Sequence, residues 1–256
     1  MTLAELFEAI AAAAGAATLP HFRTRLAVDN KVAGGFDPVT EADRAAERAI
    51  RALIEREFPD DGIHGEEYGL VRADAPRRWV IDPVDGTRAF ITGLPVWGTL
   101  VGLVENGHAV AGMMAQPFTG ELFYADGTRA ELVRGGTRQA LGVSGCQSLD
   151  AARMFTTTPA LFTGDARAKF DRLERAVQLS RYGTDCYAYV MVAAGMADLV
   201  VETGLQSYDI AGLIPIIEQA GGVVTTFDGT RAENGGTVIA AASAELHAAA
   251  LEFMRP

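Results

Sequence analysis

Apolar residues in the first part of the chain recur at every third or fourth position, which is the spacing of an amphipathic helix. One such run covers residues 2–17, and a second begins after Thr40, whose hydroxyl suits a helix N-cap. The pattern then changes to short apolar runs at residues 79–81, 99–104, 109–114 and 122–124. Asn106-Gly107, between the second and third of these runs, is a typical hairpin turn. These patterns predict two helices packed on an antiparallel sheet.

The rest of the chain alternates short strands with helices. Strands are expected at residues 154–157, 198–201, 223–225 and 237–240, and helices at 166–179, 186–194, 207–220 and after Ser243. Alternation of this kind favours an α/β layer. We therefore expect two halves, an α+β half over residues 1–140 and an α/β half over residues 141–256. The polar, glycine-rich segment 29–38 is predicted to be a loop.

Composition narrows the range of partners. Of the 256 residues 49% are hydrophobic, which is ample for a buried core, and 22 basic against 33 acidic residues give a net charge of −11. The absence of a basic stripe argues against an extended nucleic-acid surface, and no apolar stretch in the sequence is long enough to cross a membrane. An acidic protein that binds an anionic substrate needs cations between the two, which metal ions would supply.

Cysteine usage and the start of the sequence both predict a cytoplasmic protein. Cys146 and Cys186 lie far apart without metal-ligand spacing, which is typical of reduced thiols, and Cys186 is expected to be a packed residue rather than a nucleophile. Residues 1–19 include Glu5 and Glu8 and lack a basic n-region, so they do not resemble a signal peptide.

The most informative segment is 82–87, which reads Asp-Pro-Val-Asp-Gly-Thr after a short apolar run. Two carboxylates at the end of a buried strand can share divalent cations. The backbone N–H groups and the hydroxyl of the Asp-Gly-Thr step offer donors to an anion at a chain reversal. Cations beside an anion site indicate phosphate chemistry. Asp-Pro and Asp-Gly are also ordinary turn dipeptides, so this segment alone leaves a simple turn equally open.

Other acidic residues could complete a metal site, although each has a plainer explanation. Glu66 and Glu67 could be a solvated pair in a loop. Asp209, before a strongly apolar run, and Asp43, after Thr40, could each be a favourable charge in the first turn of a helix.

Considered together, three separated segments resemble the signature stretches of the inositol monophosphatase superfamily. They are Gly65-Glu66-Glu67, residues 79–87 and residues 208–212, with Glu-Gln-Ala-Gly-Gly at 218–222 beyond them. Their order matches, as does the seven-residue gap from Glu202 to Asp209. The resemblance implies a layered αβαβα sandwich and a lithium-sensitive, Mg²⁺-dependent phosphomonoesterase that is usually a homodimer.

The resemblance also implies roles for individual residues. Two or three Mg²⁺ ions would be held by the side chains of Glu66, Asp82, Asp85 and Asp209 and by the backbone carbonyl of Val84. The implied catalytic residues are Thr87, which would orient the attacking water, Asp43, which would assist it, and Glu66. The backbone N–H groups of Gly86 and Thr87 would hold phosphate oxygens.

Less general segments indicate the substrate. Residues 88–99, 112–121 and 181–189 resemble the histidinol-phosphatase branch, which acts in histidine biosynthesis. Histidinol phosphate carries an ammonium group and an imidazole, so Asp185 could pair with the ammonium and Glu202 could bond a ring N–H or the amine. Arg88 is a third candidate contact. One departure is Gln206, where the branch leads us to expect a basic residue.

Three alternatives stay open at this point. Asp185 could merely cap a helix that begins at Cys186. The substrate could be inositol 1-phosphate, or the enzyme could hydrolyse a broad range of sugar or nucleotide phosphates. A catalytically silent regulatory protein on the same fold is disfavoured, because all the expected carboxylates are present.

Overall fold

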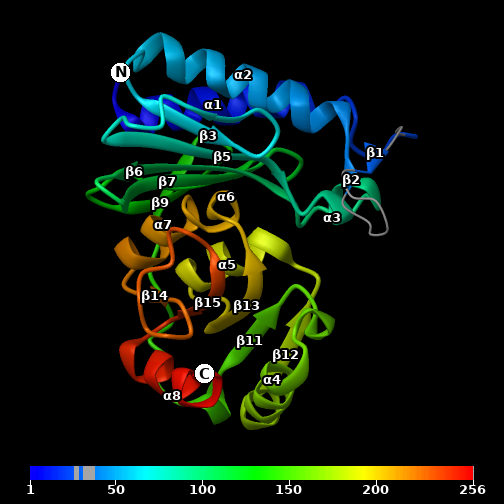
Figure 1. Ribbon diagram of the computed structural model, residues 1–256, viewed down its shortest axis with the longest axis vertical. Helices are drawn as coiled ribbons and strands as arrows, with labels where there is room; N and C mark the ends of the chain where they lie inside the picture. The colour runs from blue at the N-terminus through cyan, green and yellow to red at the C-terminus, as the bar shows by residue number, and fades with distance from the viewer. Residues whose placement is uncertain (26–28, 31–37, 256) are drawn as a thin grey trace.

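The computed structural model describes residues 1–25, 29–30 and 38–255, and it has five alternating layers of helix and sheet (Figure 1). Two helices form one outer layer, and an eight-stranded sheet lies beneath them. Three helices separate this sheet from a five-stranded sheet, which two further helices cover. The predicted αβαβα sandwich is therefore confirmed. Most of the segment 29–38 falls outside the described residues, apart from the short antiparallel pair β1 (Asp29–Asn30) and β2 (Pro38–Val39).

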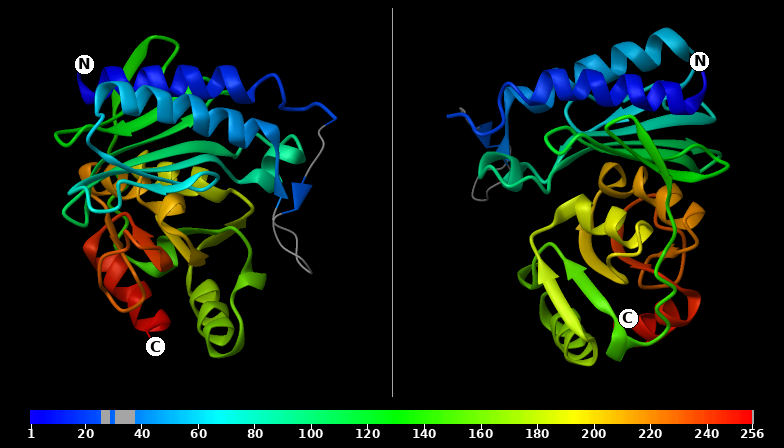
Figure 2. Two further views of the ribbon diagram at one scale, coloured as in Figure 1. Left: turned by 45° about the horizontal axis from the view of Figure 1, so that its top comes forward. Right: turned by 180° about the vertical axis from the view of Figure 1, so that it is seen from behind.

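The outer layer consists of α1 (Leu3–Thr18) and α2 (Glu41–Glu57), which lie side by side on the sheet (Figure 2). Thr2 and Thr40 cap these helices through reciprocal capping boxes, as their side chains allow. Their apolar faces pack on strand residues such as Trp79, and burial of this surface is the main force that holds the layer.

The eight-stranded sheet has the order β10-β9-β8-β7-β6-β5-β3-β4. Its strands are β3 (Gly62–Gly65), β4 (Gly69–Val71), β5 (Arg77–Asp85), β6 (Gly98–Glu105), β7 (His108–Gln116), β8 (Glu121–Ala125), β9 (Ala130–Arg134) and β10 (Thr137–Ala140). The prediction of a wholly antiparallel sheet is wrong at one position, because β3 pairs parallel to β5. Strands β9 and β10 lack a continuous apolar run, and only their cross-strand partners define them.

The five-stranded sheet has the order β12-β11-β13-β15-β14. Its strands are β11 (Arg153–Thr156), β12 (Leu179–Tyr182), β13 (Leu199–Leu205), β14 (Val223–Thr225) and β15 (Gly236–Ala241). The outer helices are α4 (Gly164–Ala176) and α8 (Ala244–Met254), and the middle layer holds α5 (Asp185–Ala193), α6 (Ser207–Ile210) and α7 (Leu213–Gln219). Shorter elements are α3 (Thr87–Ile91) and the 3₁₀ turns Leu149–Ala151 and Pro159–Leu161.

Two predicted helices differ from those observed. The helix expected over 166–179 ends at Ala176, because Leu179 begins the edge strand β12. The helix expected over 207–220 is broken into α6 and α7 at Ala211 and Gly212.

Pro215, the third residue of α7, accounts for the break between α6 and α7, because proline has no N–H to donate to the carbonyl of Ala211. Close backbone contact then holds this junction against the first sheet. Gly102 and Gly112 are cross-strand partners on β6 and β7, and the α6–α7 junction lies directly on them. A Cβ atom at Gly112 would lie 2.2 Å from the carbonyl oxygen of Gly212, and one at Gly102 would lie 2.6 Å from the carbonyl carbon of Ala211. Glycine is required here for close approach, and the contact fixes the end of α6 and the start of α7 against the first sheet.

Within the described parts of the chain, no helix combines the length and the apolar character needed to span a membrane.

Candidate active site

The end of β5 supplies two of the predicted site residues. In a regular strand Asp82 and Asp85 would point to opposite faces, because side chains alternate with a period of two. A bulge shifts the register between them, so that Asp82 pairs with Leu100 and Asp85 with Gly98. The hydroxyl of Thr99 donates to the carbonyl of Pro83 at 2.8 Å and holds this irregular backbone. The bulge therefore brings both carboxylates to one side.

A third carboxylate reaches the same place from the second half of the chain. Oxygen atoms of Asp82, Asp85 and Asp209 all lie within 4.8 Å of one another. Asp209 Oδ2 accepts a hydrogen bond from the N–H of Gln206 at 2.6 Å, and Asp85 Oδ2 accepts one from the N–H of Cys186 at 2.7 Å. Asp209 does lie in the first turn of a helix, where a negative charge is favourable, but the same side chain also joins the carboxylate cluster.

Burial and mutual repulsion make this cluster suited to cations. Burial raises the pKa of Asp82 well above its ordinary value, and the charges of Glu66, Asp85 and Asp209 raise it further. Burial also raises the pKa of Asp85, with added repulsion from Asp209 and Asp185. Carboxylate oxygens that converge in this way are the donor set that hard divalent cations prefer, so the residues present fit a metal site.

The other predicted residues come from the turn after β3, the segment after β5 and the start of α2. Glu66 lies directly after β3, within hydrogen-bonding reach of the Asp82 side chain. Thr87 Oγ1 donates to the carbonyl of Val84 at 3.0 Å, which places a hydroxyl at the predicted carbonyl ligand. Asp43 is buried in the first turn of α2, where its Oδ2 accepts from the hydroxyl and the N–H of Thr40 at 2.6 and 2.9 Å.

The two predicted substrate carboxylates share a cavity with the cluster. Asp185 and Glu202 line a cavity of about 30 Å³ together with Asp85 and Asp209. The N-cap of α5 is Thr184, and Asp185 is its first residue with φ of +43°, so Asp185 is not the cap. Burial raises the pKa of Asp185, against the opposing charge of Arg88.

Glu202 lies in the middle of β13 and is held there by residues at the end of β11. Its Oε1 accepts from the N–H of Thr157, and its Oε2 accepts from the hydroxyl of Thr156 at 3.2 Å. Burial raises the pKa of Glu202 to about 7 despite these hydrogen bonds. Its charge therefore changes near neutral pH.

Sequence reasoning missed Thr157, Tyr189 and Leu205 as residues of this cavity, whereas Cys186 is buried as expected. Thr157 lines the cavity and holds Glu202, and Tyr189, expected only to pack, lines it with a buried hydroxyl that has no hydrogen-bond partner among the described residues. No local pattern distinguishes either residue. Burial and the charge of Asp85 raise the pKa of the Cys186 thiol well above its ordinary value, so this cysteine is a poor nucleophile.

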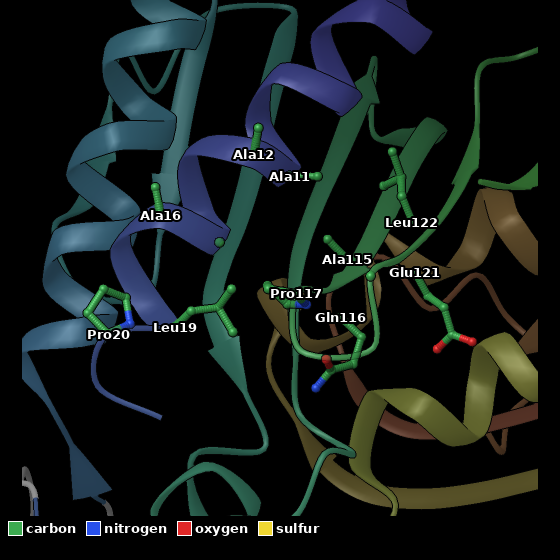
Figure 3. A pocket seen from close by; sticks show the side chains of 12 residues that line it. Ala11, Ala12, Ala16, Leu19, Pro20, Ala115, Gln116, Pro117, Glu121 and Leu122 are labelled. Atoms are coloured by element: carbon green, nitrogen blue, oxygen red, sulfur yellow. The ribbon is translucent and has the colours of Figure 1, made fainter. Parts of the chain in front are cut away.

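A much larger cavity lies elsewhere and does not belong to this site. It has a volume of about 650 Å³ and is lined by α1 and the β7–β8 turn (Figure 3). Its lining is mostly alanine, leucine and proline, and its one charged residue, Glu121, accepts hydrogen bonds from Thr119 and Tyr187. Judged by volume alone, this cavity would be taken as the active site. The carboxylates with raised pKa values line the small cavity instead, and such groups are typical of active sites.

The family comparison identifies this layered protein with its carboxylate group as a phosphatase hydrolase. The chain belongs to the inositol monophosphatase family, whose model matches residues 2–255. The resemblance carried by the three motifs is thus confirmed.

Relatives within the family bear several names. The chain is 36% identical over 257 residues to the chloroplastic bifunctional phosphatase IMPL2 of Arabidopsis thaliana, covering 96% of this chain and 73% of that protein. It is 36% identical over 221 residues to the histidinol-phosphatase of Chlorobaculum parvum, covering 86% and 84%. A solved inositol monophosphatase from Zymomonas mobilis superposes with a TM-score of 0.87 at 40% identity, covering 98% of this chain and 96% of that one.

Proposed function

We propose that this phosphatase is a Mg²⁺-dependent phosphomonoesterase that hydrolyses L-histidinol phosphate to L-histidinol and phosphate. The observation that carries the proposal is the shared cavity, in which Asp185 and Glu202 lie beside Asp85 and Asp209. A substrate whose phosphate lies at the cluster would extend its other end toward two more carboxylates. That arrangement favours a substrate with a cationic end.

The metal site would be formed by oxygen ligands from both halves of the chain. Two or three Mg²⁺ ions would be held by Glu66, Asp82, the Val84 carbonyl, Asp85 and Asp209. Bound cations supply Lewis acidity, which lowers the pKa of a water molecule and neutralises charge on the phosphoryl group and the leaving oxygen.

Residues of the chain itself would orient the reactants. The hydroxyl proton of Thr87 is engaged by the Val84 carbonyl, so Thr87 Oγ1 would accept a hydrogen bond from the attacking water. Asp43, fixed by Thr40, would assist in orienting that water, and Glu66 would take part in catalysis as a metal ligand. The N–H groups of Gly86 and Thr87 would donate to phosphate oxygens, and Gly86, with φ of +78°, allows the turn that exposes them.

Inositol 1-phosphate is the second candidate substrate. The 40% identity to the Zymomonas mobilis inositol monophosphatase supports it, and Asp185 and Glu202 could accept hydrogen bonds from hydroxyl groups as well. Two histidinol-phosphatase features favour the first candidate, namely the Gly183-Thr184-Asp185-Cys186 segment and the relative in Chlorobaculum parvum.

Phosphate release from the two esters decides between them. With equal concentrations and saturating Mg²⁺, we expect kcat/KM for histidinol phosphate to exceed that for inositol 1-phosphate by about 100-fold, because a cation held by two carboxylates contributes more than neutral hydroxyls. Comparable or faster turnover of inositol 1-phosphate would remove histidinol phosphate as the substrate.

The titration of Glu202 predicts a pH dependence of substrate binding. Its pKa is raised to about 7, so the carboxylate is charged above this pH and neutral below it. The KM for histidinol phosphate should therefore fall as pH rises through 7. In Glu202→Gln this dependence should flatten, and KM at pH 8 should rise roughly 10-fold, the cost of one charged hydrogen bond.

Two controls separate recognition from general damage. Glu252→Gln makes the same change at an exposed position on α8 and should leave the KM profile unchanged. An aryl phosphate without a cationic group should show little difference between the unaltered enzyme and Glu202→Gln. An unchanged KM profile in Glu202→Gln would contradict a role for this carboxylate in binding the cation.

The proposal extends to the assembly and location of the protein. We propose a cytoplasmic homodimer that acts on a small-molecule phosphate monoester, with no nucleic-acid or membrane partner. The net charge of −11 argues against a nucleic-acid partner, and the two free cysteines are typical of a cytoplasmic protein. The homodimer is proposed from the family resemblance alone.

A further inference from the structure

A buried carboxylate lies beneath the turn that carries Glu66. Glu47 is on α2, and its side chain is fully buried. Its Oε2 accepts a hydrogen bond from the N–H of Glu67 at 2.7 Å, and its Oε1 accepts one from the N–H of Tyr68 at 3.2 Å. Both amides belong to the turn between β3 and β4. Glu47 therefore binds the backbone immediately after Glu66.

Arg51, one helical turn further along α2, completes this contact. Its Nε donates to Glu47 Oε1 at 2.7 Å, and its Nη2 donates to the carbonyl of Gly69 at the far end of the same turn. A buried ion pair loses hydration on both sides, and an apolar pair of similar volume would often stabilise a fold as well. A contribution to stability therefore does not account for the pair. Its hydrogen bonds to the backbone of residues 67–69 indicate instead that it holds the turn in one conformation.

The strand that enters the turn is adapted to the same carboxylate. A Cβ atom at Gly65 would lie 1.9 Å from Glu47 Oε1, so only glycine permits this approach. Gly65 directly precedes Glu66, and the N–H of Glu66 donates to the carbonyl of Ile81 on β5 at 3.1 Å. The backbone is thus held on both sides of the Glu66 side chain.

Repulsion within the carboxylate cluster explains why the turn that carries Glu66 must be held in place. Asp82 and Asp85 lie on a strand inside the sheet, and Asp209 is in a helix fixed by the glycine contact. Glu66 alone lies in a turn beside the edge strand β4. Like charges would therefore displace Glu66 more easily than any other member.

We propose that Glu47, supported by Arg51, is a positioning residue that holds Glu66 in place to bind metal. The inference rests on the metal site of the proposed function and not on the identity of the substrate. Groups that orient a metal ligand change metal affinity by about 10- to 100-fold when removed.

Binding of Mn²⁺ alone to metal-free protein tests the proposal. Loss of the free-ion electron paramagnetic resonance signal measures the dissociation constant without substrate. We expect Glu47→Gln to raise this constant about 10- to 100-fold, with the Mg²⁺ concentration for half-maximal phosphate release shifted alike. A merely structural role would lower the melting temperature and leave the dissociation constant unchanged.

Two further variants keep the test decisive. Glu41→Gln removes the same charge from an exposed position on α2 that pairs with Arg48, and it should shift Mn²⁺ binding less than twofold. Arg51→Lys keeps the charge but cannot bond both Glu47 and the carbonyl of Gly69, so it should weaken Mn²⁺ binding by several-fold. If Glu47→Gln does not fold, the Mn²⁺ affinity of Arg51→Lys tests the positioning role in its place.

Different failures would be distinguishable. If the unaltered protein binds Mn²⁺ and both variants match Glu41→Gln within twofold, the positioning role is overturned while the metal site stands. If the unaltered protein does not bind Mn²⁺, the metal site is wrong and the proposal falls with it. Failure to hydrolyse histidinol phosphate would affect neither result.

Discussion

Asp85→Asn is expected to reduce Mg²⁺-dependent turnover by at least about 10³-fold while leaving the fold intact. Asp85 contributes to the three-carboxylate group and is held in place by the N–H of Cys186. An amide has the same shape but lacks the charge, so the variant should pack normally and bind metal poorly. Phosphate release across a Mg²⁺ series, with circular dichroism as a check of folding, measures both effects.

The same substitution should stabilise the metal-free protein at neutral pH. Because the folded pKa of Asp85 is raised, its charge opposes folding above that pKa, and the penalty disappears as pH falls toward the ordinary carboxyl pKa of about 4. We therefore expect metal-free Asp85→Asn to melt a few degrees above the unaltered protein at pH 8, with the difference shrinking toward pH 5.

Two outcomes would contradict the assignment of Asp85. Retained Mg²⁺-dependent activity in Asp85→Asn would remove it from the metal ligands. A lower melting temperature in the absence of metal would show that its carboxylate stabilises the fold, contrary to the expected repulsion. Asp228→Asn, a change outside the carboxylate group, serves as the control and should alter neither quantity.

Gly112→Ala is expected to lower activity by about 100-fold although Gly112 is not among the residues that line the cavity. Its added methyl group would lie 2.2 Å from the carbonyl oxygen of Gly212, so the junction of α6 and α7 must shift away from the sheet. Asp209 is three residues before Gly212 and would move with it. A displacement of about 1 Å at a reacting centre can cost 10²-fold in rate.

Stability should fall in the same variant. Overpacking of a tight contact costs about 1–3 kcal/mol, which lowers the melting temperature by several degrees in a chain of this size. Gly142→Ala is a matched control, because a Cβ atom there meets no atom within 4 Å and the residue does not have a positive φ. Full activity in Gly112→Ala would mean that the glycine contact does not set the position of Asp209.

Much of the fold followed from local pattern. The 3.6-residue period placed α1 and α2 within a residue or two, because each buries one apolar face and begins at a threonine cap. Strands with continuous apolar runs, such as β6 and β7, were found for the same reason. Strands β3, β4, β9, β10 and β12 were missed, because a pairing partner and not their composition makes them strands. The division into halves at residue 140 stays a prediction.

The sequence by itself determined which side chains could bind metal and phosphate, because their chemistry and motif order are visible without coordinates. Only the tertiary structure decided how they meet. The bulge after Asp82 cancels the alternation of the strand, the paired glycines let α6 approach the sheet, and the turn after β3 is held by Glu47. Each of these depends on contact between residues distant in sequence, and local periodicity carries no information about such contacts.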